Sequence, residues 1–252
     1  MSRMKKIMLI VSAAAVVGAE AVSPVLVPAP RKMVEREGVY SVKAEKVEAS
    51  LAAFATDAAL PPEGYTLSVT ANGISVKSAE KAGAFYAVQT LRQLAAKENG
   101  KLVFPCVEIE DSPSYSWRGV HFDDCRHFFG KETLKKTLDL MAQHKMNVLH
   151  WHLTEDQGWR LEIKKYPLLT EKGQWRKETV IGSLSSGVYD GTPYGGYYTQ
   201  EQVRELVQYA AERYVTIIPE IELPGHALAA ISSSPWGTRR RRCGSVPTGT
   251  GR

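Results

Sequence analysis

The stretch HWHLTEDQGWR, residues 150–160, gathers side chains that could do acid–base or ligand-binding chemistry. It holds two histidines, the adjacent acids Glu155 and Asp156, two tryptophans and Arg160. Flat aromatic rings such as Trp159 stack on the apolar face of a sugar ring, while carboxylates and arginine hydrogen-bond its hydroxyls. A solvated loop face is the ordinary explanation for two adjacent acids. The elements that position the stretch must therefore decide between a sugar site and a plain surface.

Three apolar segments predict strands, and helical patterns separate them. The strands are expected at 117–122, 146–153 and 215–223, and the helices at 131–145 and 199–214, where Thr199 and Gln202 form a capping box. Alternating strands and helices predict a parallel sheet with the helices outside it. In a (β/α) barrel, functional groups lie at the carboxyl ends of the strands. The sequence therefore predicts the first three strand–helix units of such a barrel.

Polar residues stand at the end of each predicted strand. Because the carboxyl ends of parallel strands meet at one edge of a sheet, we expect these side chains to face a common site. Arg126 is expected to pair with an acid such as Asp123, and the Pro224–Gly225 turn is expected to present His226. The residues concerned are Asp123 and Arg126, then His150, His152, Glu155 and Asp156, and finally Glu220, Glu222 and His226.

A zinc site is an alternative use of the histidines. His150 and His152 are two residues apart on a strand, so they point to the same side, and His226 could join them. No obvious further ligand completes the set, so we favour histidines that hydrogen-bond within the strand-end polar layer and expect no metal. The three cysteines have no metal-ligand spacing, and Cys106 and Cys125 are expected to be buried thiols rather than a bridge.

Residues 25–111 predict a separate, small α+β domain. Residues 64–77 alternate apolar and polar side chains on both sides of Asn72–Gly73, which is typical of a hairpin. Residues 79–100 have helical spacing and end on Gly100, and residues 101–111 read as a further strand. The turn-forming segment Asp111–Ser114 then marks the boundary with the barrel.

The amino end has the layout of a secretory signal peptide. Residues 1–21 combine a basic start, an eleven-residue apolar stretch and small residues at Ala19 and Ala21, so we expect an exported, periplasmic or extracellular protein. The apolar stretch is too short for stable membrane insertion, which needs about 20 residues. The formal charge of +5 comes from this leader and from five arginines in the last 20 residues, which leaves a mildly acidic body and no support for a nucleic-acid partner.

Four segments together resemble the glycoside hydrolases of family 20, the β-N-acetylhexosaminidases. They are WRGVHFDDCRHFF, MNVLHWHLTEDQGWRLEIKKYP, GGYYTQEQVRELVQYAAERY and PEIELPGHA, in that order, and residues 25–111 resemble the small domain before the barrel. The resemblance implies a glycan substrate ending in an N-acetylhexosamine, substrate-assisted hydrolysis and no cofactor. It implies that Arg118 binds the sugar hydroxyls, beside Glu155 and Trp159, and that Asp156 and His226 support the catalytic acid.

One departure from the family pattern bears on activity. The family carries its catalytic acids in a Gly-Gly-Asp-Glu segment, and the 252 residues contain none. Residues 236–252 include four consecutive arginines without apolar periodicity, so we expect an aberrant basic tail, from a frameshift or premature stop, and an inactive chain. A non-catalytic sugar-binding remnant and a zinc-dependent hydrolase are the alternatives. The expected order is a signal peptide (1–21), the α+β domain (25–111), an incomplete (β/α)8 TIM barrel (113–235) and the tail (236–252).

Overall fold

The computed structural model describes residues 24–43, 54–183 and 185–234, in two compact units. The first unit comprises Met1–Val120, Thr137–Val148 and Ala210–Thr216, and the second comprises His121–Lys136, Leu149–Tyr209 and Ile217–Arg252. The expected signal peptide and basic tail, with Cys243, lie outside the described residues. Each unit is therefore considered separately below.

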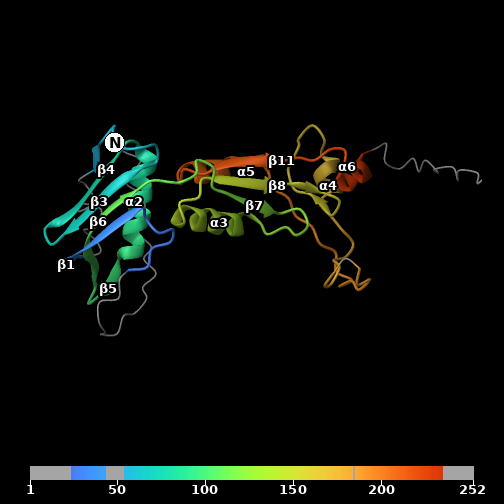
Figure 1. Ribbon diagram of the computed structural model, residues 1–252. Coiled ribbons are helices and arrows are strands. Elements are labelled where there is room, and N and C mark those ends of the chain that lie inside the picture. Colours follow the sequence, from blue (N-terminus) through green and yellow to red (C-terminus); the bar gives the residue numbers. More distant parts are fainter. Residues whose placement is uncertain (1–23, 44–53, 184, 235–252) are drawn as a thin grey trace, which may run out of the picture. The chain divides into compact units, whose positions relative to one another are not determined.

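The first unit is built on a six-stranded sheet (Figure 1). The strand order is β1-β6-β3-β4-β2, and β5 pairs with β6. Strands β3 and β4 form the expected hairpin, in which Thr70 pairs with Gly73 across a two-residue turn. The strands are β1 (Lys32–Lys43), β2 (Phe54–Thr56), β3 (Tyr65–Thr70), β4 (Gly73–Ser78), β5 (Ala96–Glu98) and β6 (Lys101–Asp111).

Helix α2 (Lys81–Leu94) covers one face of this sheet, and the core lies between them (Figure 1). Alternate residues of β3 and β4 are buried, as a half-exposed strand requires, and they pack with Phe85 and Leu91 of the helix. Burial of these apolar side chains is the main source of stability for this unit.

The predicted helix over residues 79–100 is too long at its carboxyl end. The structure ends α2 at Leu94 and begins strand β5 at Ala96. Asn99 and Gly100 both have positive φ, 48° and 76°, and they turn the chain back so that Glu98 pairs with Lys101. Asn–Gly is the dipeptide that such a tight hairpin favours, so Gly100 belongs to a β-turn and not to a helix end.

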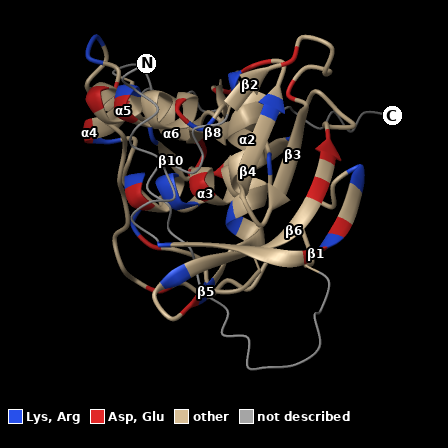
Figure 2. Cartoon of the chain, turned by 90° about the vertical axis from the view of Figure 1, so that its left-hand side faces the viewer, with Lys and Arg blue, Asp and Glu red and all other residues tan. Residues whose placement is uncertain are grey.

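Charged residues mark β1 as a protected edge strand. Most of its residues are exposed, and the blue and red segments in Figure 2 mark basic and acidic positions along β1 and β6. The pairing register with β6 shifts between Glu35 and Val39, where Gly38 has a φ of +100°. Charges and a bulge both discourage pairing with a strand of another chain, so the sheet ends at β1.

The second unit contains most of a three-stranded sheet of order β11-β8-β7. The three strands occur where the sequence predicts them, with helices between them. The predicted capping box also forms, because Thr199 and Gln202 exchange backbone-to-side-chain hydrogen bonds of 3.0 and 3.2 Å. From residue 119 onward the elements are β7 (Gly119–Asp123), α3 (Lys131–Gln143), β8 (Val148–His152), β9 (Thr154–Glu155), β10 (Gly158–Trp159), α4 (Leu168–Glu171), α5 (Gln200–Ala211), β11 (Thr216–Glu220) and α6 (Leu228–Ser233). The parts of them that lie before residue 121, in Thr137–Val148 or in Ala210–Thr216 belong to the first unit.

A buried carboxylate organises the interior of the second unit. Asp124, fully buried, accepts hydrogen bonds from Trp151 Nε1 at 2.9 Å, Tyr198 Oη at 2.6 Å and the Phe129 amide at 2.8 Å. Burial raises the pKa of Asp124, although these hydrogen bonds oppose the rise. Because its partners come from β8 and from the segment before α5, Asp124 ties the end of β7 to the rest of the unit.

Arg160 is a second fully buried group in this unit. Its guanidinium donates to four backbone carbonyls, those of Asp124 and Cys125 at 3.2 and 2.7 Å and those of Gln174 and Gly196 at 2.8 and 3.0 Å. A buried charge is tolerated only when its hydrogen-bonding groups are satisfied, and the carbonyls do this. Arg160 thereby fastens the loop after β7 to the long loop between α4 and α5.

Two smaller findings complete the fold. Cys106 and Cys125 are both free and buried, as expected of thiols that pack in a core. Among the described residues, no helix combines the length and the apolar character needed to cross a bilayer.

Candidate active site

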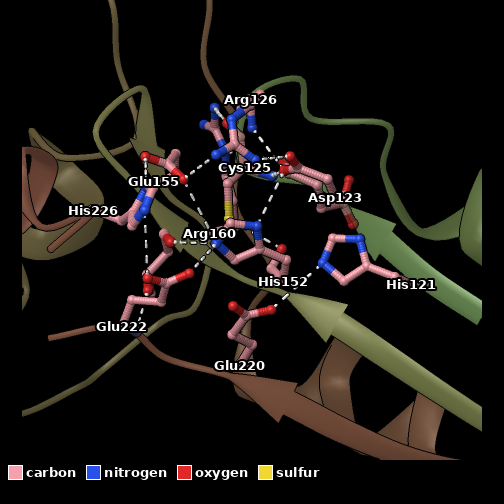
Figure 3. Close-up of polar contacts among 12 residues, drawn as sticks. His121, Asp123, Cys125, Arg126, His152, Glu155, Arg160, Glu220, Glu222 and His226 are labelled. Carbon is pink, nitrogen blue, oxygen red and sulfur yellow. Dashed lines mark hydrogen bonds and ion pairs between the residues drawn. The ribbon is translucent and has the colours of Figure 1, made fainter.

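The carboxyl ends of β7, β8 and β11 bring polar side chains together, as the sequence predicts (Figure 3). Each strand supplies residues from its last positions and from the loop that follows it. We call this group the strand-end cluster, and it consists of Asp123, Arg126, His152, Glu155, Glu220, Glu222 and His226.

Arg126 lies between two acids, which confirms the expected pairing with Asp123. It contacts Asp123 Oδ2, and its Nη2 donates to Glu155 Oε2 at 2.7 Å. Asp123 Oδ1 also accepts from the amides of Cys125 and Arg126, at 3.0 and 3.1 Å. Burial alone would raise the pKa of Asp123, but the hydrogen bonds from Arg126 outweigh it and lower that pKa. The side chain of Arg126 remains 51% exposed, so a fixed guanidinium faces solvent.

Glu155 joins Arg126 to His226. Its side chain is only 3% exposed, and its Oε1 lies 2.6 Å from Nδ1 of His226 (Figure 3). The hydrogen bond that Glu155 accepts from His226 raises the pKa of His226, and the charges of Glu155 and Glu222 add to this effect. The result is an oriented imidazole ring beside an oriented guanidinium, both held by one buried carboxylate.

Asp156 does not have the position that the sequence suggested. It is exposed, and its Oδ1 accepts the Leu228 amide at 3.0 Å, at the start of α6. Glu155, and not Asp156, contacts His226, although the resemblance assigns the supporting role to Asp156 together with His226. Adjacent residues after a strand point in different directions, so only one of the two acids can reach the histidine.

Two further acids lie close to the histidines. Glu220 is the last residue of β11. Glu222 lies two residues later, and its Oε1 is 3.4 Å from Nε2 of His152. Burial would raise the pKa of Glu220, but a hydrogen bond with Glu222 and the charges of three histidines outweigh burial and lower that pKa. The same hydrogen bond raises the pKa of Glu222. Two carboxyl groups whose pKa values are pushed apart can share one proton between them.

His152 confirms the expectation that at least one histidine belongs to the polar layer. It is 3% exposed, and its Nε2 lies 2.8 Å from the carbonyl oxygen of Thr154. The zinc set of His150, His152 and His226 does not form among the residues that the structure describes. His226 turns to Glu155, whereas His150 pairs with Glu220 at 2.6 Å.

Arg118, predicted to bind the sugar, lies elsewhere. It immediately precedes β7, so it stands at the amino end of that strand, whereas the strand-end cluster follows the carboxyl end. Within the first unit its Nη1 and Nη2 donate to the two carboxylate oxygens of Glu63 at 2.9 and 3.0 Å. Tyr86 Oη and the carbonyls of Tyr115 and Lys145 take its remaining donors. The sugar-binding role was predicted for Arg118, but the arginine that lies beside Glu155 is Arg126.

The tryptophans divide between core and surface. Trp159, expected at the sugar, is 9% exposed, and its Nε1 donates to the Leu161 carbonyl at 2.5 Å. Trp151 is 1% exposed and holds Asp124. Trp175, in the loop after α4, is 56% exposed, so of these three tryptophans it is the one that can offer a ring face.

Sequence reasoning missed two residues of the second unit. His121 lies two residues before Asp123 on β7, and its Nε2 is 3.5 Å from Oε2 of Glu220. Alternation along the strand could have placed it on the same face as Asp123. The burial of Arg160 has no comparable signal, because nothing in the sequence distinguishes an arginine bound to carbonyls from one in solvent.

The arrangement suits recognition of a polar ligand and proton transfer. Arg126 is fixed in direction yet half-exposed, so its N–H groups can donate to hydroxyl oxygens. His226, held by Glu155 and with a raised pKa, can hold a proton at the strand ends.

Both units match family models that were derived from known proteins. The model of the glycosyl hydrolase family 20 catalytic domain matches residues 115–246, just over half of the chain, and that of domain 2 of the same family matches residues 29–112.

Curated relatives carry related names. A β-hexosaminidase of Porphyromonas gingivalis is 50% identical over 188 residues, which cover 71% of this chain and 23% of the relative. A β-N-acetylhexosaminidase of Cellulomonas fimi is 39% identical over 169 residues, 67% of this chain and 32% of the relative. The chain thus spans about a quarter to a third of the length of these relatives.

Solved structures resemble the chain as well. The exo-β-N-acetylglucosaminidase of Vibrio harveyi, in complex with N-acetylglucosamine, aligns with a TM-score of 0.73 and 32% identity over 82% of this chain and 37% of its own. The β-N-acetylhexosaminidase of Bacteroides fragilis aligns with a TM-score of 0.71 and 34% identity over 84% of this chain and 48% of its own.

Proposed function

Because this chain belongs to glycosyl hydrolase family 20, we propose that its activity is the hydrolysis of terminal N-acetylglucosamine or N-acetylgalactosamine from glycans. The observation that carries the proposal is the chain of contacts from Arg126 through Glu155 to His226. It joins a donor for sugar hydroxyls to a histidine of raised pKa at the strand ends, where barrel enzymes bind their substrates.

The roles proposed for these residues follow from their contacts. Arg126 takes the hydroxyl-binding role first expected of Arg118, because half of its side chain is open to a ligand and the rest is fixed by two acids. Glu155 and His226 take the supporting role first expected of Asp156 and His226. In substrate-assisted hydrolysis the acetamido oxygen of the sugar attacks its own anomeric carbon, and an enzyme acid protonates the leaving oxygen.

Sugar binding can be tested on the purified 252-residue chain. Calorimetry with N-acetylglucosamine should give saturable heat, and Arg126→Leu should weaken the binding at least about tenfold, because charge-assisted hydrogen bonds to the sugar are lost. Arg204→Gln is the matched control, since Arg204 is a surface arginine paired only with Glu201 at 3.4 Å. Equal binding by the parent and Arg126→Leu would reject the assigned role.

We propose that these 252 residues alone do not turn over substrate. Their sequence has no Gly-Gly-Asp-Glu segment, so the acid that protonates the leaving oxygen is not among them. A chromogenic N-acetylglucosaminide should release no chromophore above the rate of an enzyme-free control. Release that tracks with the purified chain and disappears in His226→Ala would contradict this proposal. Saturable binding without release would also fit a non-catalytic sugar-binding protein.

We also propose that the chain is exported, because residues 1–21 have the layout of a signal peptide. Amino-terminal sequencing of the protein recovered from outside the cytoplasm should begin at Glu20 or Val22, after a cut behind Ala19 or Ala21. A chain that stays in the cytoplasm and begins at Met1 would overturn this part of the proposal.

A further inference from the structure

Two histidines and one acid from three neighbouring strands converge on a point that the proposed hydrolysis does not use. His121 is the third residue of β7, His150 is the third of β8, and Glu220 is the last of β11. Nε2 of His150 lies 2.6 Å from Oε2 of Glu220, and Nε2 of His121 lies 3.5 Å from the same oxygen. One ligand atom from each residue lies within 4.8 Å of the other two.

The polar atoms of this group are poorly satisfied by the protein. Oε2 of Glu220 is buried without a hydrogen bond, although His150 Nε2 is close to it. Within residues 24–43, 54–183 and 185–234, neither the His121 ring nor the His150 ring has a polar partner other than Glu220. The histidine side chains are 50% and 44% exposed, so an ion can reach them from solvent. Figure 3 shows His121 and Glu220 facing each other.

We propose that Nε2 of His121, Nε2 of His150 and Oε2 of Glu220 bind one divalent transition-metal ion of the zinc class. Two imidazoles and a carboxylate form a ligand set that zinc accepts, with the fourth tetrahedral position left for water. Zinc bonds of about 2.1 Å place neighbouring ligand atoms about 3.4 Å apart. The two distances to Glu220, 2.6 and 3.5 Å, lie on either side of that value, so small side-chain rotations suffice to admit the ion.

The other groups of ligand-type side chains are less suited to an ion. His152 is 3% exposed, and its Nε2 is already engaged by the Thr154 carbonyl at 2.8 Å. Cys125 is fully buried, and its Sγ donates to the His152 carbonyl at 3.0 Å. Nitrogen ligands also argue against magnesium and calcium, which prefer oxygen. The site therefore selects zinc or a neighbouring transition metal, and the bound ion would join β7, β8 and β11.

Metal binding can be measured on the intact chain without an activity assay. After chelation and dialysis, titration with zinc chloride should give saturable heat with one ion per chain, and magnesium chloride should not compete. His121→Gln and His150→Gln should each weaken zinc binding at least about tenfold, since each removes one ligand. His144→Gln is the matched control, because His144 is exposed and lies outside the group. No saturable binding by the parent, or undiminished binding by both ligand variants, would overturn the proposal.

A second measurement does not depend on whether the variants fold. In the ¹⁵N-labelled parent, zinc should shift the side-chain resonances of His121 and His150, while those of His127, His144 and His226 stay unchanged. Shifts confined to the latter three would refute the ligand assignment. N-acetylglucosamine binding is measured on the zinc-free chain. A chain that binds no zinc therefore leaves the proposed function untouched, and a chain that binds no N-acetylglucosamine leaves the metal-site proposal untouched.

Discussion

Each unit contains an arginine clamped by a glutamate, and the two pairs differ in what they leave open. In the first unit, the side chains of Arg118 and Glu63 are 17% and 19% exposed, and Tyr86 and two carbonyls take the other donors of the arginine. In the second unit, Glu155 is 3% exposed but Arg126 is 51% exposed. An arginine whose donors are all taken by the protein stabilises the fold. An arginine that is held by a buried glutamate but keeps exposed donors can also bind a ligand.

The comparison extends to the lysine of the first unit. Lys145 Nζ donates to Asp111 Oδ2 at 2.7 Å and to Tyr65 Oη at 2.9 Å, and both members of the ion pair are at most 10% exposed. Burial lowers the pKa of Lys145, although the charge of Asp111 opposes this. Both of these pairs in the first unit are largely buried, whereas in the second unit Arg126 pairs with buried Glu155 and leaves half of its own side chain exposed.

The largest effect is expected from breaking the buried lysine pair. Lys145→Met leaves the Asp111 carboxylate without a cation, which should lower the free energy of unfolding of the first unit by about 3–5 kcal/mol. Hydrogen exchange of the β3 and β6 amides in urea measures this change. Lys164→Met, at an exposed pair with Glu201 of 3.0 Å, is the control and should have no measurable effect. Equal effects at both sites would refute the contrast between the buried and exposed pairs.

Replacing the two arginines should separate stability from binding. Arg118→Leu leaves Glu63 unpaired and should cost about 2–3 kcal/mol of unfolding free energy, with N-acetylglucosamine binding unchanged. Arg126→Leu should cost less, about 1 kcal/mol, because His226 still pairs with Glu155 and the exposed guanidinium is screened by solvent, yet it should weaken binding at least about tenfold. Urea unfolding and calorimetry on the same samples test both statements. The comparison fails if Arg118→Leu loses binding while keeping its stability.

A smaller effect is expected at Asp156. Asp156→Ala removes the acceptor for the Leu228 amide at the start of α6 and should cost about 0.5–1 kcal/mol, as loss of a helix-capping contact does. Thermal unfolding followed by circular dichroism measures it. The titration of His226 should not change in this variant, and a changed midpoint would show that Asp156, and not only Glu155, acts on the histidine.

The smallest change is a pH effect at His226. Its raised pKa means that the folded state binds the proton more tightly, so the pair with Glu155 stabilises the fold below the ordinary histidine pKa of about 6.5. That contribution is lost as the pH rises through the higher folded value. Proton NMR of the ring should give a midpoint above 6.5 that falls in Glu155→Gln. A midpoint that is the same in both proteins would show that Glu155 is not the cause.

Much of the fold could be predicted from sequence, because the periodicity of apolar residues locates strands and their ends. Strand alternation and helical spacing gave the β3–β4 hairpin, α3, α5 and the three strands of the second unit. Arg126 beside Asp123 followed from the same reasoning. The predicted helix over residues 79–100 extends too far, because alanine and lysine after Leu94 are good helix formers. The turn at Asn99–Gly100, which ends a hairpin rather than a helix, is the signal that the periodicity conceals.

Direction and burial were harder to predict. Arg118 and Arg126 flank the same short strand, and only the direction of that strand determines which of them joins the acids at its carboxyl end. Glu155 and Asp156 are adjacent acids, and the backbone path after β8 sends only the first to His226. Trp159 looks like a sugar platform in sequence, but its burial depends on tertiary packing that no local pattern records.

Arg160 links the loop that carries Arg126 to the loop that carries Trp175. One guanidinium donates to carbonyls of both loops, so neither can shift without breaking hydrogen bonds that also hold the other. A lysine offers one nitrogen in place of a planar fork and could not span both. The position of the exposed Arg126 therefore depends on a second arginine that is itself fully buried.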